Sequence, residues 1–419
     1  ALVAGVAGIV FSFLLVGFVA IAGKRGSAPT MVLSRAAFGV RGNRLPSVIS
    51  WLLTVGWETV LTTLATLATA TVFSRLGWGG GTGTLLVALV VVASLTVAAG
   101  VLGFQLIMRL QTVITVVTGV LTVVYILLVV DDVDVAAVAA LPAGSAQEVL
   151  GALVMLMTGF GLGWVNAAAD YSRYLPRSAS GRGVVVWTTV GSALAPLVLF
   201  AFGLLLAGSS AELSDAIAAD PIGALTGAVP TWFLVPFALV AVLGLVGGAV
   251  LDIYSSGLAM LAMGVRVPRY VAALIDGVIM IMGTVYAVFF GGEFLGQFQG
   301  FLITLGVPVA AWCGVVLADI ALRRRDYDEA ALFDPAGRYG DVRPFPIAVV
   351  VIATLLGWGL VVNESAPWLA WQGYLLGPLG GREGSWAYAN LGVLVALVLA
   401  FLATLAGTRR VVRAPPARA

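Results

Sequence analysis

Apolar runs of about twenty residues recur eleven times along this 419-residue chain, separated by short polar loops. A run of that length is needed to cross the hydrocarbon core of a bilayer, and it must be helical because lipid offers no partner to backbone polar groups. The predicted spans are 1–23, 46–73, 84–104, 107–130, 149–169, 183–208, 230–262, 268–290, 298–320, 345–363 and 386–407. The pattern therefore predicts an all-α integral membrane protein with eleven transmembrane helices.

The basic residues are concentrated in every second loop between the predicted spans. Of the 22 Lys and Arg residues, 20 fall on one set of loops and the C-terminal tail, and only Arg75 and Arg382 fall on the other set. Acidic residues such as Asp131, Asp215 and Glu364 lie in that other set. Because cytoplasmic loops retain positive charge, we expect a multi-pass protein of the cell (cytoplasmic) membrane, with residue 1 outside and the C-terminus in the cytoplasm.

Composition excludes several classes of protein. The chain is 61% hydrophobic and 10% charged, with a mean hydropathy of +1.08, so it has no ordinary soluble surface. A net charge of +2 does not indicate a nucleic-acid partner. The chain has no His and a single Cys, Cys313, which removes imidazole catalysis, a His-ligated metal or haem, and thiolate clusters. We expect no enzyme, no metal, no cofactor and no obligate protein partner.

The chain reads as one transmembrane domain, residues 1–419. Its longest polar stretch, Arg323 to Arg343, is only a loop, and residues 408–419 form a predicted cytoplasmic tail whose end is expected to be disordered. Ala1 begins abruptly in apolar sequence without a signal peptide. An odd number of spans with residue 1 outside leads us to expect one further helix before Ala1.

Three carboxylates lie inside predicted spans, where ionisable groups are costly and mark function by default. Glu58 directly follows Trp57, which places an aromatic face beside a carboxylate and suits a flat polar ligand. Asp252 follows a glycine-rich stretch that includes Gly244, Gly247 and Gly248. Close helix packing would also explain those glycines, and a bond to a neighbouring helix would explain Glu58. For Asp276 we favour a structural partner.

A second signal is the segment Gly159–Asn166, in which three alternate glycines and two aromatics interrupt an apolar span. Glycines of this kind predict an unwound helix, whose freed backbone groups bind ligands or ions at the bilayer midplane of transporters. An aromatic here and Trp57 on another helix would sandwich a planar ring. The alternative is a glycine-lined helix crossing.

Four segments of the chain carry a family resemblance. They are SRAAFGVRG at 34–42, VGW at 55–57, ADYSRYLP at 169–176, and AD at 318–319 followed by RRRDY at 323–327. In this order and spacing they resemble the nucleobase:cation symporter 1 family, in its purine, cytosine and allantoin permease group. The resemblance runs over essentially the whole chain.

The resemblance implies a leucine-transporter-like fold of two inverted five-helix repeats that works by alternating access. The helices of this chain then correspond to family helices 2–12. Residues 1–130 form the remainder of the first repeat, 149–320 the second repeat, and 345–407 two C-terminal helices. The helix before Ala1 would be family helix one, which supplies part of the ion and substrate sites.

In the family, a nucleobase-like ring stacks between aromatics of helices three and six, and polar groups of helices three, six and eight read its edge. Helix three is the 46–73 span, helix six 149–169 and helix eight 230–262. The implied substrate-binding residues are Thr54, Trp57, Glu58, Phe160, Gly161, Gly163, Trp164, Asn166 and Ala249. The implied gating or structural residues are Asp170, Arg173 and Asp319.

Two features of the chain depart from the family pattern. The sodium-coupled branch has a hydroxyl pair on helix eight where this chain has Gly247 and Gly248, which puts a sodium site of that design in doubt. The side-chain amide one turn before the helix-three Trp is replaced by Thr54. Either Glu58 assumes its hydrogen-bonding role or the substrate differs.

The sequence therefore predicts a secondary active transporter that imports a nucleobase or related planar heterocycle, such as cytosine, a purine, uracil or allantoin. Glu58 would read ring N–H donors and Asn166 the amide-like edge. Glu58 or Asp252 would carry a coupling proton, with sodium as the alternative cation, and Gly244, Gly247 and Gly248 mark the candidate ion region. The alternatives are a carrier of the same fold for an amino acid or other small solute, and a non-transporting membrane sensor or scaffold.

Overall fold

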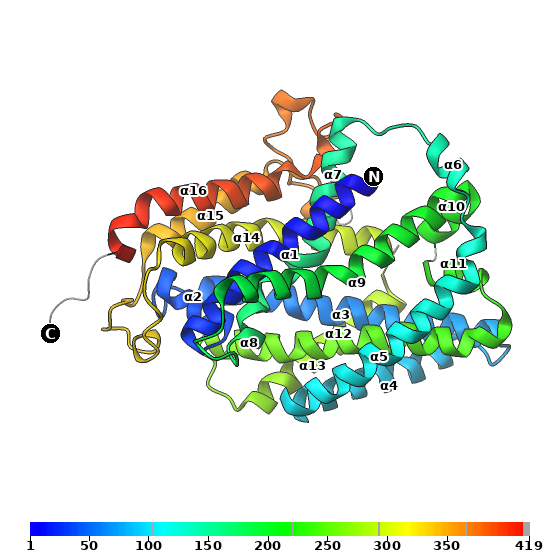
Figure 1. Ribbon diagram of the computed structural model, residues 1–419, viewed down its shortest axis with the longest axis horizontal. Helices are drawn as coiled ribbons and strands as arrows, with labels where there is room; N and C mark the ends of the chain where they lie inside the picture. The colour runs from blue at the N-terminus through cyan, green and yellow to red at the C-terminus, as the bar shows by residue number, and fades with distance from the viewer. Residues whose placement is uncertain (103, 220, 292–293, 365–366, 414–419) are drawn as a thin grey trace.

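The computed structural model describes residues 1–102, 104–219, 221–291, 294–364 and 367–413 (Figure 1). The long helices are α1 (Leu2–Gly26), α3 (Arg44–Arg75), α4 (Thr82–Leu102), α5 (Phe104–Val129), α9 (Gly181–Ser209), α12 (Leu234–Ala262), α13 (Arg269–Phe289), α14 (Phe294–Leu322) and α16 (Leu391–Arg413). The shorter ones are α2 (Thr30–Phe38), α6 (Val135–Ala140), α7 (Ala146–Met157), α8 (Ala168–Ser172), α10 (Ala211–Ala219), α11 (Pro221–Gly227) and α15 (Pro344–Trp358). Within these ranges there is no β-strand, as predicted.

Ten helical segments are long and apolar enough to cross a membrane, counted over the described residues, against eleven predicted. The exception is the predicted span 345–363, of which only α15, fifteen residues, is helical. Fifteen residues rise about 22 Å, less than the roughly 30 Å of a hydrocarbon core. The helix stops because Gly359 and Leu360 form a turn, after which Asn363 donates to the Gly300 carbonyl (3.0 Å). Apolar composition continues past the helix end, which is why the prediction was too long.

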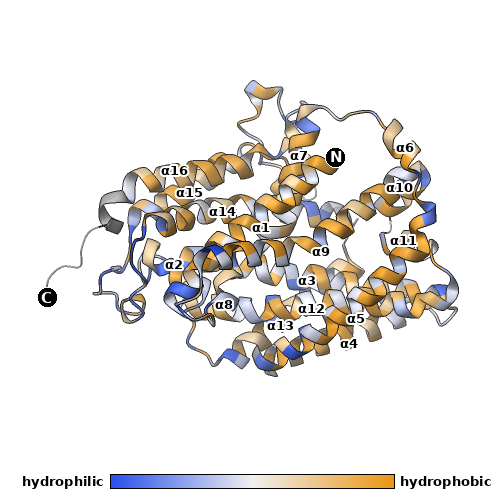
Figure 2. Cartoon of the chain, viewed as in Figure 1, coloured by the Kyte–Doolittle hydropathy of each residue, from blue (hydrophilic) through white to orange (hydrophobic). Residues whose placement is uncertain are grey.

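Hydropathy divides the bundle into apolar shafts and two polar ends (Figure 2). One end, here called the basic end, consists of the loops 24–44, 173–182, 263–269 and 323–343 with the last turn of α16. The opposite, acidic end carries the loops after α3, α5, α9 and α13. Arg75, one of the two basic residues at the acidic end, donates from its guanidinium to the Gly223 carbonyl (2.9 Å). A local backbone partner thus accounts for its position.

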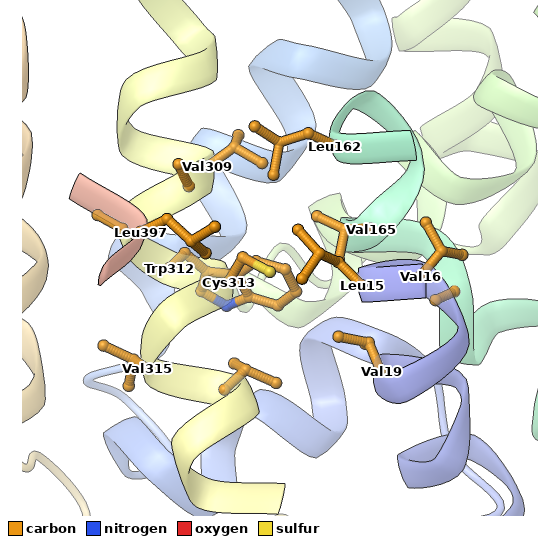
Figure 3. Packing of buried hydrophobic residues seen from close by; sticks show 14 of the residues in the cluster. Leu15, Val16, Val19, Leu162, Val165, Val309, Trp312, Cys313, Val315 and Leu397 are labelled. Carbon is orange, nitrogen blue, oxygen red and sulfur yellow. The ribbon is translucent and has the colours of Figure 1, made fainter. Parts of the chain in front are cut away.

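Helix α14 lies at the centre of the main core. In its most apolar stretch 78% of residues are buried, whereas the corresponding figure for α5 is 6%, so α5 presents its apolar surface outward. Around Trp312 and Cys313 of α14 pack Leu15 of α1, Val165 and Leu397 (Figure 3). The Trp312 indole N–H donates to the Ser34 hydroxyl (3.0 Å), which links α14 to α2.

The predicted span 149–169 is interrupted as the glycine pattern indicated. After α7 the chain forms a π-helical turn, η2 (Thr158–Leu162), in which Phe160 has non-helical dihedral angles (φ −107°, ψ −106°). A 3-10 turn, η3 (Val165–Ala167), then leads into α8. At its other end α7 begins with a capping box between Ser145 and Glu148, which satisfies two orphan N–H groups. Below, "the break" means residues 158–167.

The last helix extends into the predicted C-terminal tail. Helix α16 continues through Arg413, so residues 408–413 are helical, and the remainder of the predicted tail, residues 414–419, lies outside the described residues. The predicted span ends where the apolar run meets the first basic residues. A helix continues through arginines, because Arg is a good helix former.

Close packing of α14 on α16 gives a stability prediction. A Cβ at Gly314 would lie 2.4 Å from the Leu397 carbonyl oxygen and 2.8 Å from the Phe401 nitrogen. We expect Gly314→Ala to destabilise the protein by about 1–3 kcal/mol, the usual cost of overpacking, and to lower the melting temperature in detergent. The matched control is Gly191→Ala in α9, where a Cβ meets nothing within 4 Å. Equal melting temperatures for the two variants would contradict the predicted packing.

Candidate functional site

A cavity of about 1120 Å³ lies between α1, α3, α5, the break, α9, α12 and α14. Its lining comprises Phe13, Val16, Trp57, Leu61, Met108, Gln111, Thr115, Met155, Leu156, Gly159, Phe160, Trp164, Ala167, Ala168, Tyr171, Ser172, Leu175, Thr188, Ser192, Pro196, Gly248, Leu251, Asp252, Phe298, Gln299 and Leu302. Ligand cavities are typically about 300–1,000 Å³ and mostly apolar with a few convergent polar groups. This cavity is larger than one heterocycle requires, so the position of a ligand has to be argued from individual side chains.

Trp57 supplies the most distinctive wall of the cavity. Two phenylalanines of α14 stand edge-on to its indole, Phe298 with ring centroids 5.5 Å apart and Phe301 at 6.1 Å. Its indole nitrogen is buried without a hydrogen-bond partner in the described structure. The phenylalanines fix the ring, and its N–H remains available for a ligand acceptor.

The glycines of the break differ in their surroundings. A Cβ at Gly163 would lie 3.0 Å from the Trp57 indole nitrogen, so this glycine lets the break approach the ring. Gly161 instead packs on α1, where a Cβ would lie 2.3 Å from the Ser12 carbonyl carbon and where its own N–H donates to the Ser12 hydroxyl (3.0 Å). Gly159 lines the cavity. For Gly161 the structure therefore favours the helix crossing that the sequence left open.

Phe160 and Trp164, the two aromatics predicted to face a ligand, both line the cavity and are half-buried. Thr54 and Asn166 do not line it. Thr54 is buried and donates to the Ser50 carbonyl (3.0 Å), and Asn166 donates from its amide to the Ser50 hydroxyl (2.8 Å). Asn166 therefore joins the break to α3, whereas the Thr54 bond lies within α3.

On α12, Asp252 faces the cavity together with Gly248. Asp252 is 2% exposed, and its Oδ2 has no hydrogen-bond partner in the described structure. One turn earlier, the Gly247 carbonyl accepts a hydrogen bond from the Gln111 side-chain amide of α5 (2.6 Å). Ala249 is fully buried, and Gly244 is exposed with open space where a Cβ would be. Of the α12 candidates, Asp252 and Gly248 belong to the cavity.

Glu58 and Asp276 lie outside the cavity lining, although Glu58 was predicted to contact the ligand. Both are fully buried where α3, α12 and α13 meet. Adjacent residues on a helix point about 100° apart, so Trp57 faces the cavity and Glu58 faces α13. Asp276 accepts hydrogen bonds from the Trp51 indole and the Ser256 hydroxyl, which confirms its expected structural partners.

Asp170, Arg173 and Asp319 all lie in polar contacts at the basic end. Asp170 accepts hydrogen bonds from the Thr30 backbone N–H (2.8 Å) and the Thr30 hydroxyl (3.0 Å), which fastens the start of α2 to α8. Arg173 donates to the hydroxyl of Tyr254 on α12 (2.7 Å). These contacts connect the end of the broken helix to two neighbours. That these residues gate transport stays a prediction.

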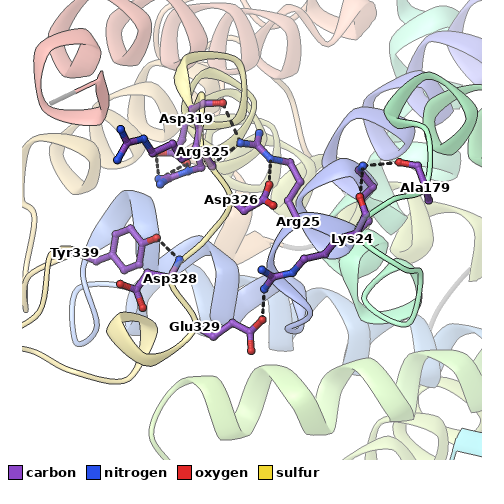
Figure 4. Close-up of polar contacts among 11 residues, drawn as sticks. Lys24, Arg25, Ala179, Asp319, Arg325, Asp326, Asp328, Glu329 and Tyr339 are labelled. Carbon is purple, nitrogen blue, oxygen red and sulfur yellow. Dashed lines mark hydrogen bonds and ion pairs between the residues drawn. The ribbon is translucent and has the colours of Figure 1, made fainter. Parts of the chain in front are cut away.

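Asp319 pairs with Arg323 (2.8 Å), whose guanidinium also stacks over the Tyr327 ring (4.6 Å). The same loop is tied to α1 through Arg25, which donates to Asp326 (3.1 Å), and to the loop after α8 through an ion pair of Arg177 with Glu329 (Figure 4). The basic end is thus crosslinked between segments far apart in sequence.

Sequence reasoning missed several cavity residues, notably Gln111 and Thr115 of α5 and Phe298 and Gln299 of α14. The two glutamines were visible as uncharged polar residues inside apolar spans. A search for carboxylates and helix-breaking glycines does not find them. Phe298 had no signal in the sequence, because any apolar span contains phenylalanines.

Comparison with known proteins identifies the family. The sequence profile of the family described as "Permease for cytosine/purines, uracil, thiamine, allantoin" matches residues 1–377. The chain belongs to this permease family. No curated protein matches the sequence.

Solved structures support the same fold for this permease. Mhp1, a nucleobase-cation-symport-1 family transporter, matches in a closed conformation with bromovinylhydantoin bound, with a TM-score of 0.70 and 18% identity over 98% of this chain and 85% of that chain. Mhp1 in an inward-facing conformation gives a TM-score of 0.67 at 18% identity over 98% and 83% of the two chains. A mutant manganese transporter from Eremococcus coleocola matches at 0.52 and 15% identity, over 97% of this chain and 88% of that chain. The permease therefore has the predicted leucine-transporter-like fold and is a transporter, not an enzyme.

The different roles of the break glycines give a second prediction. We expect Gly161→Ala to lower the melting temperature in detergent, because its Cβ meets the α1 backbone, at a cost of about 1–3 kcal/mol. Gly159→Ala is the matched control, since its Cβ meets only Leu302, at 3.5 Å. Destabilisation by Gly159→Ala but not by Gly161→Ala would refute the arrangement of the break.

Proposed function

We propose that this permease imports a nucleobase or a related planar heterocycle by alternating access. The observation that carries the proposal is the wall of the cavity formed by Trp57 and the break. The Trp57 indole is held edge-on by Phe298 and Phe301, and two further aromatics, Phe160 and Trp164, line the same space. Flat rings of this kind favour a flat ligand by offset stacking.

Asp252 is the carboxylate suited to read the edge of that ligand. It is the acidic residue among those lining the cavity, and one of its oxygens has no partner in the described structure. A carboxylate accepts hydrogen bonds from ring N–H or exocyclic amino groups, which nucleobases and hydantoins present. We assign to Asp252 the reading role expected of Glu58, because Glu58 does not reach the cavity. The hydantoin bound to the related Mhp1 is a planar heterocycle of the same kind.

We further propose that the cytoplasm is at the basic end and that the coupling cation is a proton. The glycines at 247 and 248 offer no hydroxyl to a sodium ion, and the Gly247 carbonyl already accepts from Gln111. A side chain at position 248 would also be crowded, because a Cβ there would lie 2.8 Å from a side-chain methyl carbon of Leu61 on α3. Buried carboxylates, which bind protons, are present instead.

Substitution of Trp57 tests the stacking site. In proteoliposomes containing the full-length protein, we expect Trp57→Ala to weaken uptake of labelled cytosine, adenine, uracil or allantoin at least about fivefold, since base–aromatic stacking contributes about 1–3 kcal/mol. Trp57→Phe should retain part of the activity. Trp187→Ala on α9, which is 75% exposed and is not among the residues that line the cavity, is the control. Unchanged affinity in Trp57→Ala, or uptake of an amino acid and none of these bases, would exclude the proposal.

Replacement of ions tests the coupling cation. We expect uptake to be unchanged when choline replaces sodium and to rise as the outside is acidified relative to the inside, because protons then enter down their gradient with the substrate. The measurement is initial uptake rate in proteoliposomes with imposed sodium or pH gradients. A strict requirement for sodium would overturn the proton assignment and leave the substrate assignment intact.

A further inference from the structure

Three carboxylates are buried inside the bundle without a basic partner. Glu58 and Asp276 are 0% exposed and Asp252 is 2% exposed, and none of the ion pairs among the described residues includes any of them. Each buried, unpaired charge costs several kcal/mol even after relaxation of its surroundings. Three charges at close quarters also repel one another. Such a cluster persists only where some of the carboxyl groups bind a neutralising ligand.

Asp276 has the contacts of an anion. The Trp51 indole N–H donates to its Oδ1 (2.7 Å), and the Ser256 hydroxyl donates to its Oδ2 (2.8 Å). Each oxygen of Asp276 therefore has one short, directed donor, and hydrogen bonds to an ionised acceptor are among the strongest in proteins. The donors come from α3 and α12, so they also hold α13 in place.

Glu58 has the opposite surroundings. Both of its oxygens are buried with no hydrogen-bond partner in the described structure. Ser256 lies close to Glu58 as well, and the hydrogen bond that its hydroxyl makes to a carboxylate in the described structure is to Asp276 Oδ2 (2.8 Å). One hydroxyl donates one hydrogen bond at a time, so Ser256 serves either carboxylate but not both. In the observed arrangement of the described residues, Glu58 lacks any donor that would stabilise a negative charge.

The groups that face Glu58 are acidic or apolar. Asp276 lies on α13, which bonds α3 on either side of Glu58, at Trp51 and at Thr62, and Asp252 lies on α12. Of the other helices that pack against α3, α4 and α11 contain no ionisable residue, and Arg35 of α2 donates to the Leu332 and Ala262 carbonyls. On α14 the ionisable residues are Cys313 and Asp319, and Phe298 and Phe301 are its ring contacts with Trp57 of α3. No described basic residue approaches Glu58 from these helices.

A metal ion does not fit this cluster. Among the described residues no group of three or more acidic, Cys or His side chains is arranged to hold one. Hard cations require six or more oxygen ligands, whereas both Asp276 oxygens here are engaged by hydrogen-bond donors, which a cation would repel. A proton requires one oxygen and no additional space.

The cluster is connected to the cavity through two helices. On α12, Asp252 lines the cavity and Ser256 lies four residues later, on the same face of the helix. On α3, Trp57 lines the cavity and Glu58 is the next residue. A ligand that displaces Trp57 or Asp252 therefore shifts the backbone that carries Glu58 and Ser256. This arrangement allows ligand and proton to bind at separate places and still influence each other.

We propose that Glu58 and Asp276, with Ser256 between them, form a proton-binding site separate from the substrate cavity. Proton binding forms one O–H bond on a Glu58 oxygen and leaves Asp276 as the anion that receives the Ser256 and Trp51 donors. Release breaks that O–H bond, returns the proton to water at the basic end, and lets the Ser256 hydroxyl rotate to Glu58. The role of this pair in coupling proton entry to substrate uptake rests on the function proposed above.

Charge-neutral variants test the transport role of the pair. An inward gradient of about one pH unit drives about tenfold accumulation when one proton accompanies each substrate. We expect Glu58→Gln to reduce this accumulation ratio to about one while exchange of labelled for unlabelled substrate continues, because exchange requires no net proton movement. Asp276→Asn should do the same. Glu212→Gln, at an exposed acid of α10, is the matched control. Full pH-driven accumulation in Glu58→Gln and Asp276→Asn would overturn the proposal.

Infrared spectroscopy tests the site without any substrate. Glu58 is the only buried glutamate in the described part of the chain, so protein labelled with ¹³C-glutamate separates its carboxyl band from those of the aspartates without a mutation. We expect wild-type protein in lipid to show a protonated carboxyl C=O band that moves with the label, disappears on alkaline titration and is missing from Glu58→Gln. If no tested base is transported but this band is present, the substrate proposal fails and the proton site stands. Absence of the labelled band at all pH values refutes the proton site.

Discussion

Desolvation of polar groups is the constraint on which the rest of this structure depends. A backbone or side-chain polar group placed in hydrocarbon has no water to bind, so its partner has to come from the protein. The consequences are visible throughout the molecule. Apolar helices form the shafts, nearly all basic residues lie at one end, and buried threonines such as Thr66 donate back to carbonyls of their own helix. Among the buried polar groups that lack a hydrogen-bond partner in the described structure, the Trp57 indole nitrogen and Asp252 Oδ2 belong to residues that line the cavity, and the two Glu58 oxygens belong to the residue next to Trp57.

The break between α7 and α8 is the place where the backbone departs from regular helical bonding, and there the Gly161 N–H has the Ser12 hydroxyl as its partner. Three alternate glycines allow the chain to leave the α-helix, and each meets different surroundings: Gly161 the α1 backbone, Gly163 the Trp57 ring and Gly159 the cavity. Packing and binding are therefore not alternatives for this segment. The approach of α1 at Gly161 holds the break, and the held break keeps Phe160 and Trp164 on the cavity wall.

The sequence predicted the membrane fold, the break and the polarity of the two ends, because each has a simple physical cause that composition and periodicity report. It predicted less well which face of a helix a residue occupies. Trp57 and Glu58 are neighbours in sequence, so both were assigned to the ligand, whereas the 100° turn between them sends one to the cavity and the other to α13. The same limit applies to Asn166, which bonds Ser50. The predicted helix boundaries differ from the structure in two places. After α15 the apolar composition continues beyond the end of the helix, and in α16 the helix continues beyond the end of the apolar composition.

Asp252 lines the cavity and Glu58 and Asp276 lie outside its lining, and this separation has a mechanistic consequence. A transporter that used one carboxylate for both ligand and proton would have them compete for the same oxygens. Here Asp252 faces the cavity, whereas Glu58 and Asp276 lie outside its lining where α3, α12 and α13 meet, so the proposed ligand and proton do not compete for one carboxylate. Because Trp57 and Glu58 share one helical turn and Asp252 and Ser256 another, the two sites communicate through short, rigid segments. The fastened α2 and the crosslinked loops hold the basic end together, so under the proposed orientation that end would have to rearrange to release both the ligand and the proton.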